Sequence, residues 1–224
     1  MSPLVRPDVS PLPGARWDVI TDLLGTNTTS VLDVGCRDRV LKDHLPSSMR
    51  YVGLDLFPPA DVIASADEPL PFEDGEFAAV VLADVLEHLN DPQAALDEAI
   101  RVASESVVVL LPNLYTLLLR VHYLTGRTFG KYSFGPDNNL DRHRWLMNFD
   151  QAAEFTRVRA ARSGWCVARE GGHTGNFRRT SARTVYAAAR MLGTPNLWAW
   201  EYVARLEPAH DGSPRATNST NSLP

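Results

Sequence analysis

The chain has 224 residues, 44% of them hydrophobic, and a formal net charge of −5. This length suits one domain with a sizeable core. No apolar run reaches the ~18–20 residues that a membrane-spanning helix needs, so we expect no transmembrane segment. The two cysteines, Cys36 and Cys166, are too few for a disulfide framework and are typical of a reduced, cytoplasmic protein.

The charges are divided unevenly along the chain. Residues 1–112 hold 7 Lys/Arg and 19 Asp/Glu, a net charge of −12, whereas residues 113–206 hold 14 and 6, a net charge of +8. Chance scatter on solvated faces accounts for this division as well as a functional cause does. The functional alternative is an acidic half that suits a cationic ligand and a basic half that faces an anionic one.

Residues 1–15 are rich in proline and predict a flexible arm, after which the chain alternates between short apolar runs and amphipathic segments. The runs predict strands, and the segments predict helices with cap or stop residues such as Asp91 and Gly25. The predicted strands are 30–35, 50–57, 61–65, 77–84 and 105–113, and the predicted helices are 16–25, 38–45 and 91–103. Such alternation is typical of an open parallel sheet with helices on both faces.

The pattern changes beyond Pro112. The apolar segment 114–124 predicts a helix that covers the sheet, with an acceptor pocket or a membrane surface as the alternatives for its apolar face. A long glycine-rich loop is predicted next, and residues 208–224 are polar and predict disorder. The later predicted elements are a loop at 125–145, helices at 150–163 and 181–193, and strands at 165–172 and 196–206.

Ligands of an open parallel sheet bind beyond the carboxyl ends of its strands. The first predicted strand ends in the stretch DVGCRDR, and Asp55 ends the second, where a carboxylate can accept both hydroxyls of a ribose. A dinucleotide turn needs glycine where Arg37 and Arg39 stand, which argues against an NAD-dependent oxidoreductase. The acidic residues nearby favour a ligand with positive charge and no phosphate, such as S-adenosylmethionine (SAM).

The stretches VLDVGCRDRVL, YVGLDL, ADEPLPFEDGEFAAVVLADVLEHLNDP and ESVVVLLPN resemble, in order and spacing, the motifs of class I SAM-dependent methyltransferases of the type 11/23-like small-molecule branch. The resemblance covers residues 30–113. It implies a Rossmann-like α/β fold with a seven-stranded, mostly parallel sheet, helices on both faces, and SAM as the cofactor. The methyltransferase domain would span 16–207, with 113–150 as an insertion that recognises the methyl acceptor.

The resemblance also implies cofactor contacts at the strand ends. The methionine part of SAM would lie over the first turn, the ribose beside the end of the second strand, and the adenine beside the loop after the third. The implied positions are Asp33, Gly35, Arg37, Asp55, Leu56, Ala66, Asp67, Ala83 and Asp84. Positive φ at Arg37 or Arg39 would cost roughly 1 kcal/mol each, whereas negative φ would leave Arg37 able to pair with the SAM carboxylate.

Methyl transfer is an in-line displacement, so the protein mainly has to hold donor and acceptor in line. His143 is the predicted general base, because its segment should cross the site mouth and the pKa of histidine lies near 6.5. A structural or substrate-binding histidine is the alternative. The predicted substrate-binding residues are Asn113, Tyr115, Tyr132, Arg142, Arg144 and Trp145, with the arginines holding an anionic group.

Glu87 and His88 are expected to support a helix turn near the cofactor rather than to catalyse. No metal site is expected, because the other histidines lack ligand spacing. The predicted function is methyl transfer from SAM to a small or medium-sized anionic acceptor, such as a glycan, a nucleotide-sugar or a lipid-linked metabolite. A stable nucleic-acid partner is not expected from an acidic chain. The arginines of the first turn motivate an alternative, a non-catalytic methyltransferase-like binding module.

Overall fold

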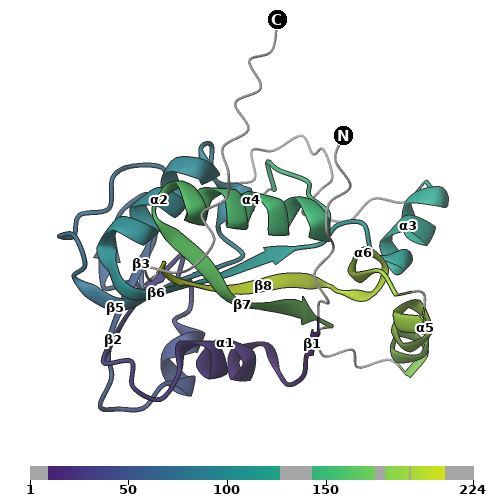
Figure 1. The fold of residues 1–224 in the computed structure, drawn as a ribbon, viewed down its shortest axis with the longest axis horizontal. Helices are drawn as coiled ribbons and strands as arrows, with labels where there is room; N and C mark the ends of the chain where they lie inside the picture. The colour runs from purple at the N-terminus through teal and green to yellow at the C-terminus, as the bar shows by residue number, and fades with distance from the viewer. Residues whose placement is uncertain (1–9, 127–142, 175–179, 192, 210–224) are drawn as a thin grey trace, which may run out of the picture.

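The computed structural model describes residues 10–126, 143–174, 180–191 and 193–209. Their strands form a single sheet in the order β1-β7-β8-β6-β5-β2-β3-β4 (Figure 1). The strands are β1 (Pro11–Leu12), β2 (Ser30–Val34), β3 (Arg50–Asp55), β4 (Val62–Ile63), β5 (Phe77–Ala83), β6 (Ala103–Pro112), β7 (Trp165–His173) and β8 (Glu201–Pro208). Within this sheet β8 runs antiparallel to β6 and β7, and the other pairs are parallel.

Helices cover both faces of the sheet, and a further group lies at the carboxyl ends of its strands (Figure 1). The helices are α1 (Arg16–Leu24), α2 (Pro92–Val102), α3 (Leu117–Leu124), α4 (Phe149–Arg162), α5 (Thr180–Met191) and α6 (Pro195–Trp198), with 3₁₀ turns η1 (Val40–His44) and η2 (Leu86–His88). One face packs against α1 and η1, and the other packs against α2 and α4. The predicted α/β class with helices on both faces is confirmed.

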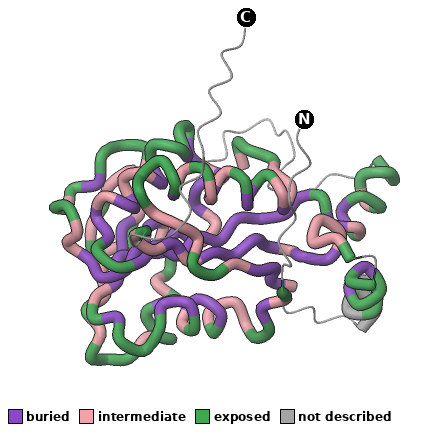
Figure 2. Tube along the Cα trace, viewed as in Figure 1, coloured by how far each residue is buried: buried purple, intermediate pink, exposed green. Residues whose placement is uncertain are grey.

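The central strands are apolar because they are covered on both sides. Every residue of β5 except Ala83 is buried, and β6 is buried from Ser106 to Pro112. Along β2, Val31 packs toward α1, while Leu32 and Val34 pack toward α2 and α4. Figure 2 shows this buried layer running through the strands, with the exposed residues on the outer helix faces and the loops.

The sheet has one strand more than the resemblance implies, because Pro11–Leu12 pairs with Gly172–His173 at the edge of β7. A Cβ on Gly171 would lie 2.6 Å from Leu12 Cγ, so glycine lets this segment approach closely. The end of the predicted arm is therefore placed against the sheet. Residues 1–9 and the predicted tail beyond 209 lie outside the described residues.

Two predicted elements differ in the structure. The predicted helix at 38–45 is only the short 3₁₀ turn η1, because Arg39 before it adopts the left-handed conformation. The predicted strand at 196–206 begins only at Glu201, because Pro195 opens the helical turn α6. The described helices are all too short or too polar to cross a bilayer.

Candidate functional site

The turns that follow β2, β3 and β5 meet at the carboxyl edge of the sheet. From β2 the chain moves outward to β3 and β4, and then crosses back to β5 on the other side of β2. The direction of winding thus reverses between β2 and β5. Ligands of open α/β sheets bind at such a reversal, so this edge is the candidate site.

Gly35 begins the turn after β2 and packs where no side chain fits. It has a φ of 72°, and a Cβ built on it would lie 2.5 Å from Val85 Cγ2. The N–H groups of Gly35 and Cys36 both donate to the Leu54 carbonyl, at 2.8 and 3.1 Å. Glycine is therefore required here for both conformation and space.

Arg37 and Arg39 adopt positive φ, 47° and 60°. Each conformation costs an L-residue roughly 1–2 kcal/mol. At Arg39 this cost is opposed by strong contacts, because its Nη2 lies 2.7 Å from Asp61 Oδ2 and its Nη1 donates to the Pro59 carbonyl at 3.2 Å. Arg39 thus fastens the first turn to the loop after β3, so an arginine in a glycine position supports the turn instead of disrupting it.

Arg37 does not meet the condition under which we expected it to pair with SAM, because its φ is positive. Its contribution is made by the backbone, whose N–H donates to Asp55 Oδ2 at 2.9 Å. Phe57 N–H lies 3.4 Å from the other oxygen, Oδ1. The Asp55 carboxylate is therefore oriented at the end of β3 and keeps acceptor capacity for a diol. Leu56 beside it is half exposed.

Asp33 lies beneath the first turn and is 4% exposed. Its Oδ2 accepts a hydrogen bond from Tyr51 Oη at 2.8 Å. Burial raises the pKa of the Asp33 carboxyl to about 7, although the Tyr51 hydrogen bond acts in the opposite direction. The side chain therefore supports the turn from inside the protein and does not present its charge at the surface.

The raised pKa of Asp33 predicts a stability that depends on pH. An unfolded aspartate ionises near pH 4 and folded Asp33 near pH 7, so ionisation destabilises the folded state as the pH rises between these values. In urea unfolding, we expect the stability of the wild type to fall relative to Asp33→Asn by roughly 2–4 kcal/mol from about pH 4 to about pH 7. A difference that does not change with pH would contradict this.

The loop after β4 carries the residues predicted to contact adenine. The Asp67 carboxylate accepts hydrogen bonds from Asn90 N at 2.7 Å and from Asn90 Nδ2 at 2.9 Å. This carboxylate therefore connects its loop to the segment before α2, and its contact with adenine stays a prediction. Ala66, which is half-buried, remains the predicted adenine neighbour in this loop.

A chain of charged groups lies next to the end of β5, and sequence reasoning missed most of it. Asp84, at φ 56°, pairs through Oδ2 with Arg16 Nη2 at 2.7 Å. Arg16 Nε is 3.8 Å from Glu201 Oε1, and Glu201 Oε2 is 2.8 Å from His173 Nδ1. Burial lowers the pKa of His173, but the hydrogen bond and the negative charge of Glu201, together with the Gly14 carbonyl, outweigh it, so the net pKa is raised. Arg16, His173 and Glu201 come from α1, β7 and β8, so no local sequence motif joins them.

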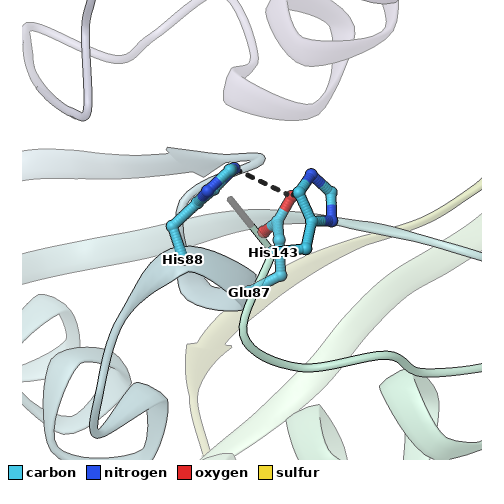
Figure 3. A group of neighbouring side chains, drawn as sticks. All are labelled: Glu87, His88 and His143. Carbon is cyan, nitrogen blue, oxygen red and sulfur yellow. Dashed lines mark ion pairs between the residues drawn. The ribbon is translucent and has the colours of Figure 1, made fainter. Parts of the chain in front are cut away.

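Glu87, His88 and His143 form a second group just beyond β5 (Figure 3). His88 Nε2 and His143 Nε2 each lie 3.9 Å from Glu87 Oε1, and the two imidazole rings are 4.5 Å apart in an edge-to-face arrangement. The exposed fractions of the side chains are 0% for Glu87, 18% for His88 and 5% for His143. His143, the predicted general base, therefore lies next to Glu87 and His88, which were expected to support a helix turn near the cofactor.

The segment after His143 is fixed to η2 by backbone hydrogen bonds. Arg144 N and Trp145 N both donate to the Glu87 carbonyl, at 2.8 and 3.2 Å. Arg144 Nε donates to the His88 carbonyl at 2.9 Å, and Trp145 Nε1 to the Leu89 carbonyl at 2.8 Å. Arg144 and Trp145 are both exposed beside the group, where they were predicted to meet a substrate.

Of the other predicted substrate-binding residues, one is buried, one is exposed and two are not described. Asn113 is 1% exposed, and its Nδ2 donates to the Ala199 carbonyl at 2.8 Å. Its amide therefore connects the end of β6 to the segment around α6, and its contact with a substrate stays a prediction. Tyr115 follows it and is 41% exposed. Tyr132 and Arg142 lie outside the described residues.

In the described part of the second half, four arginines form ion pairs with carboxylates on helices and strands away from the candidate site. These pairs are Arg157–Glu170, Arg159–Asp97, Arg169–Asp22 and Arg205–Glu207. Among the described residues, Arg144 is the exposed arginine beside the Glu87, His88 and His143 group that could meet an anionic ligand.

In a comparison with known families, the family described as a methyltransferase domain matches residues 32–111. A search of curated protein sequences found no match. Among solved structures, a SAM-dependent methyltransferase of Thermotoga maritima, described as a possible histamine N-methyltransferase, has a TM-score of 0.55 at 13% identity, covering 84% of this chain and 86% of that one.

Two further structures share the fold. A SAM-dependent methyltransferase of Archaeoglobus fulgidus has a TM-score of 0.53 at 14% identity, covering 81% of this chain and 86% of that one. The 1,6-didemethyltoxoflavin-N1-methyltransferase of Burkholderia thailandensis, solved with S-adenosylhomocysteine, has a TM-score of 0.50 at 13% identity, covering 81% and 71%. At these identities the likeness establishes the fold, and the matched family spans the strands that build the candidate site.

Proposed function

We propose that the protein, whose residues 32–111 match a methyltransferase-domain family, transfers a methyl group from SAM to a small or medium-sized anionic acceptor. The acceptor class would be a glycan, a nucleotide-sugar or a lipid-linked metabolite. The observation that carries the cofactor assignment is the Asp55 carboxylate, which two backbone N–H groups orient at the carboxyl edge of the sheet.

The residues at this edge fit SAM. Its ribose diol would meet Asp55, and its amino-acid part would meet the end of β5. There Asp84 offers a carboxylate to the ammonium group, and Arg16, its partner at 2.7 Å, offers a guanidinium to the carboxylate. The edge holds no cradle of backbone N–H groups rich in glycine, such as a pyrophosphate requires. The site therefore favours SAM over a dinucleotide.

The acceptor would lie over η2 and the segment that begins at His143. Arg144 is exposed there, and its guanidinium is held at the site by the His88 carbonyl, which leaves further N–H groups for a carboxylate or a phosphate. Trp145, 46% exposed, offers an apolar surface beside it. His143 would act in the transfer step, because it lies in the group between these residues and the end of β5.

Arg144→Ala should raise the KM for the acceptor about tenfold, because a charge-assisted hydrogen bond contributes roughly 1.5–3 kcal/mol. The dissociation constant of SAM should not change. Tritium transfer from SAM into small-molecule fractions of a cell extract would identify the acceptor, and steady-state kinetics would then measure KM. Arg162→Ala, an exposed arginine at the end of α4, is the matched control. Equal KM values for the two variants would reject this placement of the anion.

The alternative of a non-catalytic binding module makes a different prediction in the same assays. Whether or not such a module binds SAM, it would transfer no tritiated methyl group to any small-molecule fraction of the cell extract. The structure favours the enzyme, because Arg39 holds the first turn in place through Asp61 and Pro59. The arginines that motivated the alternative are thus compatible with a formed cofactor turn.

A further inference from the structure

We propose that Glu87, His88 and His143 bind a divalent first-row transition-metal ion, which would hold and activate the acceptor. Each residue offers one ligand atom, and these atoms all lie within 4.8 Å of one another. Figure 3 shows the two imidazoles and the carboxylate converging from η2 and from the segment before α4. No local sequence motif predicts this site, because His143 lies far along the chain from Glu87 and His88.

The distances fit a metal better than a hydrogen-bonded catalytic pair. Both Nε2 atoms are 3.9 Å from the same oxygen, Glu87 Oε1, which is beyond hydrogen-bond length. Around a tetrahedral ion with bonds of about 2.0–2.2 Å, neighbouring ligand atoms lie roughly 3.3–3.5 Å apart. A shift of about half an ångström would therefore bring each histidine and the carboxylate to bonding distance of a common ion.

The chemistry of the ligands selects the kind of ion. Two imidazoles and one carboxylate suit Zn²⁺, Fe²⁺, Co²⁺ or Mn²⁺, whereas Mg²⁺ and Ca²⁺ prefer ligand sets made of oxygen. Three protein ligands leave coordination positions open, as in sites where a metal binds a substrate or water. The side chains of Glu87 and His143 are buried, so the site is desolvated on the protein side.

The backbone around the group makes it rigid enough to select a metal. The N–H groups of Arg144 and Trp145 fix the segment after His143 to the Glu87 carbonyl, and the Trp145 indole donates to Leu89. Arg16 lies near enough to interact electrostatically with Glu87 and would oppose a cation, but Asp84 and Glu201 share its charge. These carboxylates therefore reduce the repulsion between Arg16 and a cation.

This role in catalysis rests on the proposed methyl transfer. A hydroxyl of the acceptor would bind the ion, and its proton would pass to water because the ion lowers the pKa of a bound hydroxyl. The resulting oxygen nucleophile would attack the methyl carbon of SAM, so that a C–O bond forms and the C–S bond breaks. S-adenosylhomocysteine leaves as a neutral thioether, and the metal keeps its oxidation state. His143 would then be a ligand and not a free general base.

The binding test uses the full chain without a histidine tag, stripped of metal and titrated with Co²⁺. We expect one Co²⁺ per chain with visible ligand-field absorption, and binding weakened at least about 100-fold in Glu87→Gln and His143→Ala. His44→Ala, an exposed histidine in η1, should bind like the wild type. Thermal unfolding of each metal-free variant checks that it is folded. A wild type without stoichiometric Co²⁺, or ligand variants that bind as tightly as the wild type, would overturn the site.

The catalytic role is tested separately from the cofactor. Removing the metal with a chelator should abolish methyl transfer while the SAM dissociation constant stays unchanged, and adding back Zn²⁺ or Co²⁺ should restore transfer. Full transfer by the metal-free chain would overturn the role. If the wild type binds Co²⁺ but not SAM, the proposed function fails and the metal site stands, so the two failures are distinguishable.

Discussion

Replacing Asp55 by alanine should weaken the binding of SAM about tenfold or more. The carboxylate ends β3 and is oriented by Arg37 N–H at 2.9 Å, so its remaining lone pairs point to one edge of the site. A hydrogen bond to a charged group contributes roughly 1.5–3 kcal/mol, and a ribose diol would lose a pair of them. Isothermal titration calorimetry of the purified variant measures the change directly.

The control for this substitution is Asp38→Ala, which removes an exposed carboxylate from the neighbouring turn after β2. Its SAM affinity should equal that of the wild type, which separates the loss of a specific acceptor from the loss of local negative charge. An Asp55→Ala variant that is folded and binds SAM as tightly as the wild type would remove Asp55 from the cofactor site.

Gly35→Ala should destabilise the protein by about 2–5 kcal/mol. The left-handed conformation costs an L-residue roughly 1–2 kcal/mol, and overpacking costs about 1–3 kcal/mol. Both apply here, because Gly35 has a φ of 72° and its Cβ would lie 2.5 Å from Val85 Cγ2. We expect a lower midpoint in urea unfolding and, because the turn must move, weaker SAM binding as well.

The double variant Gly35→Ala/Val85→Ala separates the cost of the left-handed conformation from the cost of overpacking against Val85. Removing the Val85 methyl groups relieves the overlap but not the backbone conformation. The double variant should therefore be more stable than the sum of the two single changes predicts. If the effects of the two substitutions on the free energy of unfolding simply add, the close contact between Gly35 and Val85 does not limit this turn.

Much of the fold follows from local patterns along the chain. The apolar runs of β2, β3, β5 and β6 identify buried strands, and Asp91 and Pro92 identify the start of α2, where the Asp91 side chain accepts from Ala94 N. Strand β1 could not be predicted in this way, because its two residues show no strand pattern in the sequence. They are placed by their pairing with β7 and their close approach to Gly171.

The candidate site follows from the sequence only where its residues are close together in the chain. Asp33, Gly35 and Asp55 end consecutive strands, and the motif order places them at one edge. Arg16 and Glu201 reach the same edge from opposite ends of the chain. Helix α1 carries Arg16, and the pairing of β8 with β6 and β7 places Glu201. Arg37 and Arg39 were ambiguous because φ cannot be read from residue type alone.

Calorimetric titration of the wild-type chain with SAM and with S-adenosylhomocysteine tests the central claim most directly. The arrangement of Gly35, Asp55 and Asp84 at the point where the sheet reverses direction predicts saturable binding of one molecule per chain, with the two ligands competing for one site. A folded chain that binds neither ligand would contradict a SAM-dependent methyltransferase.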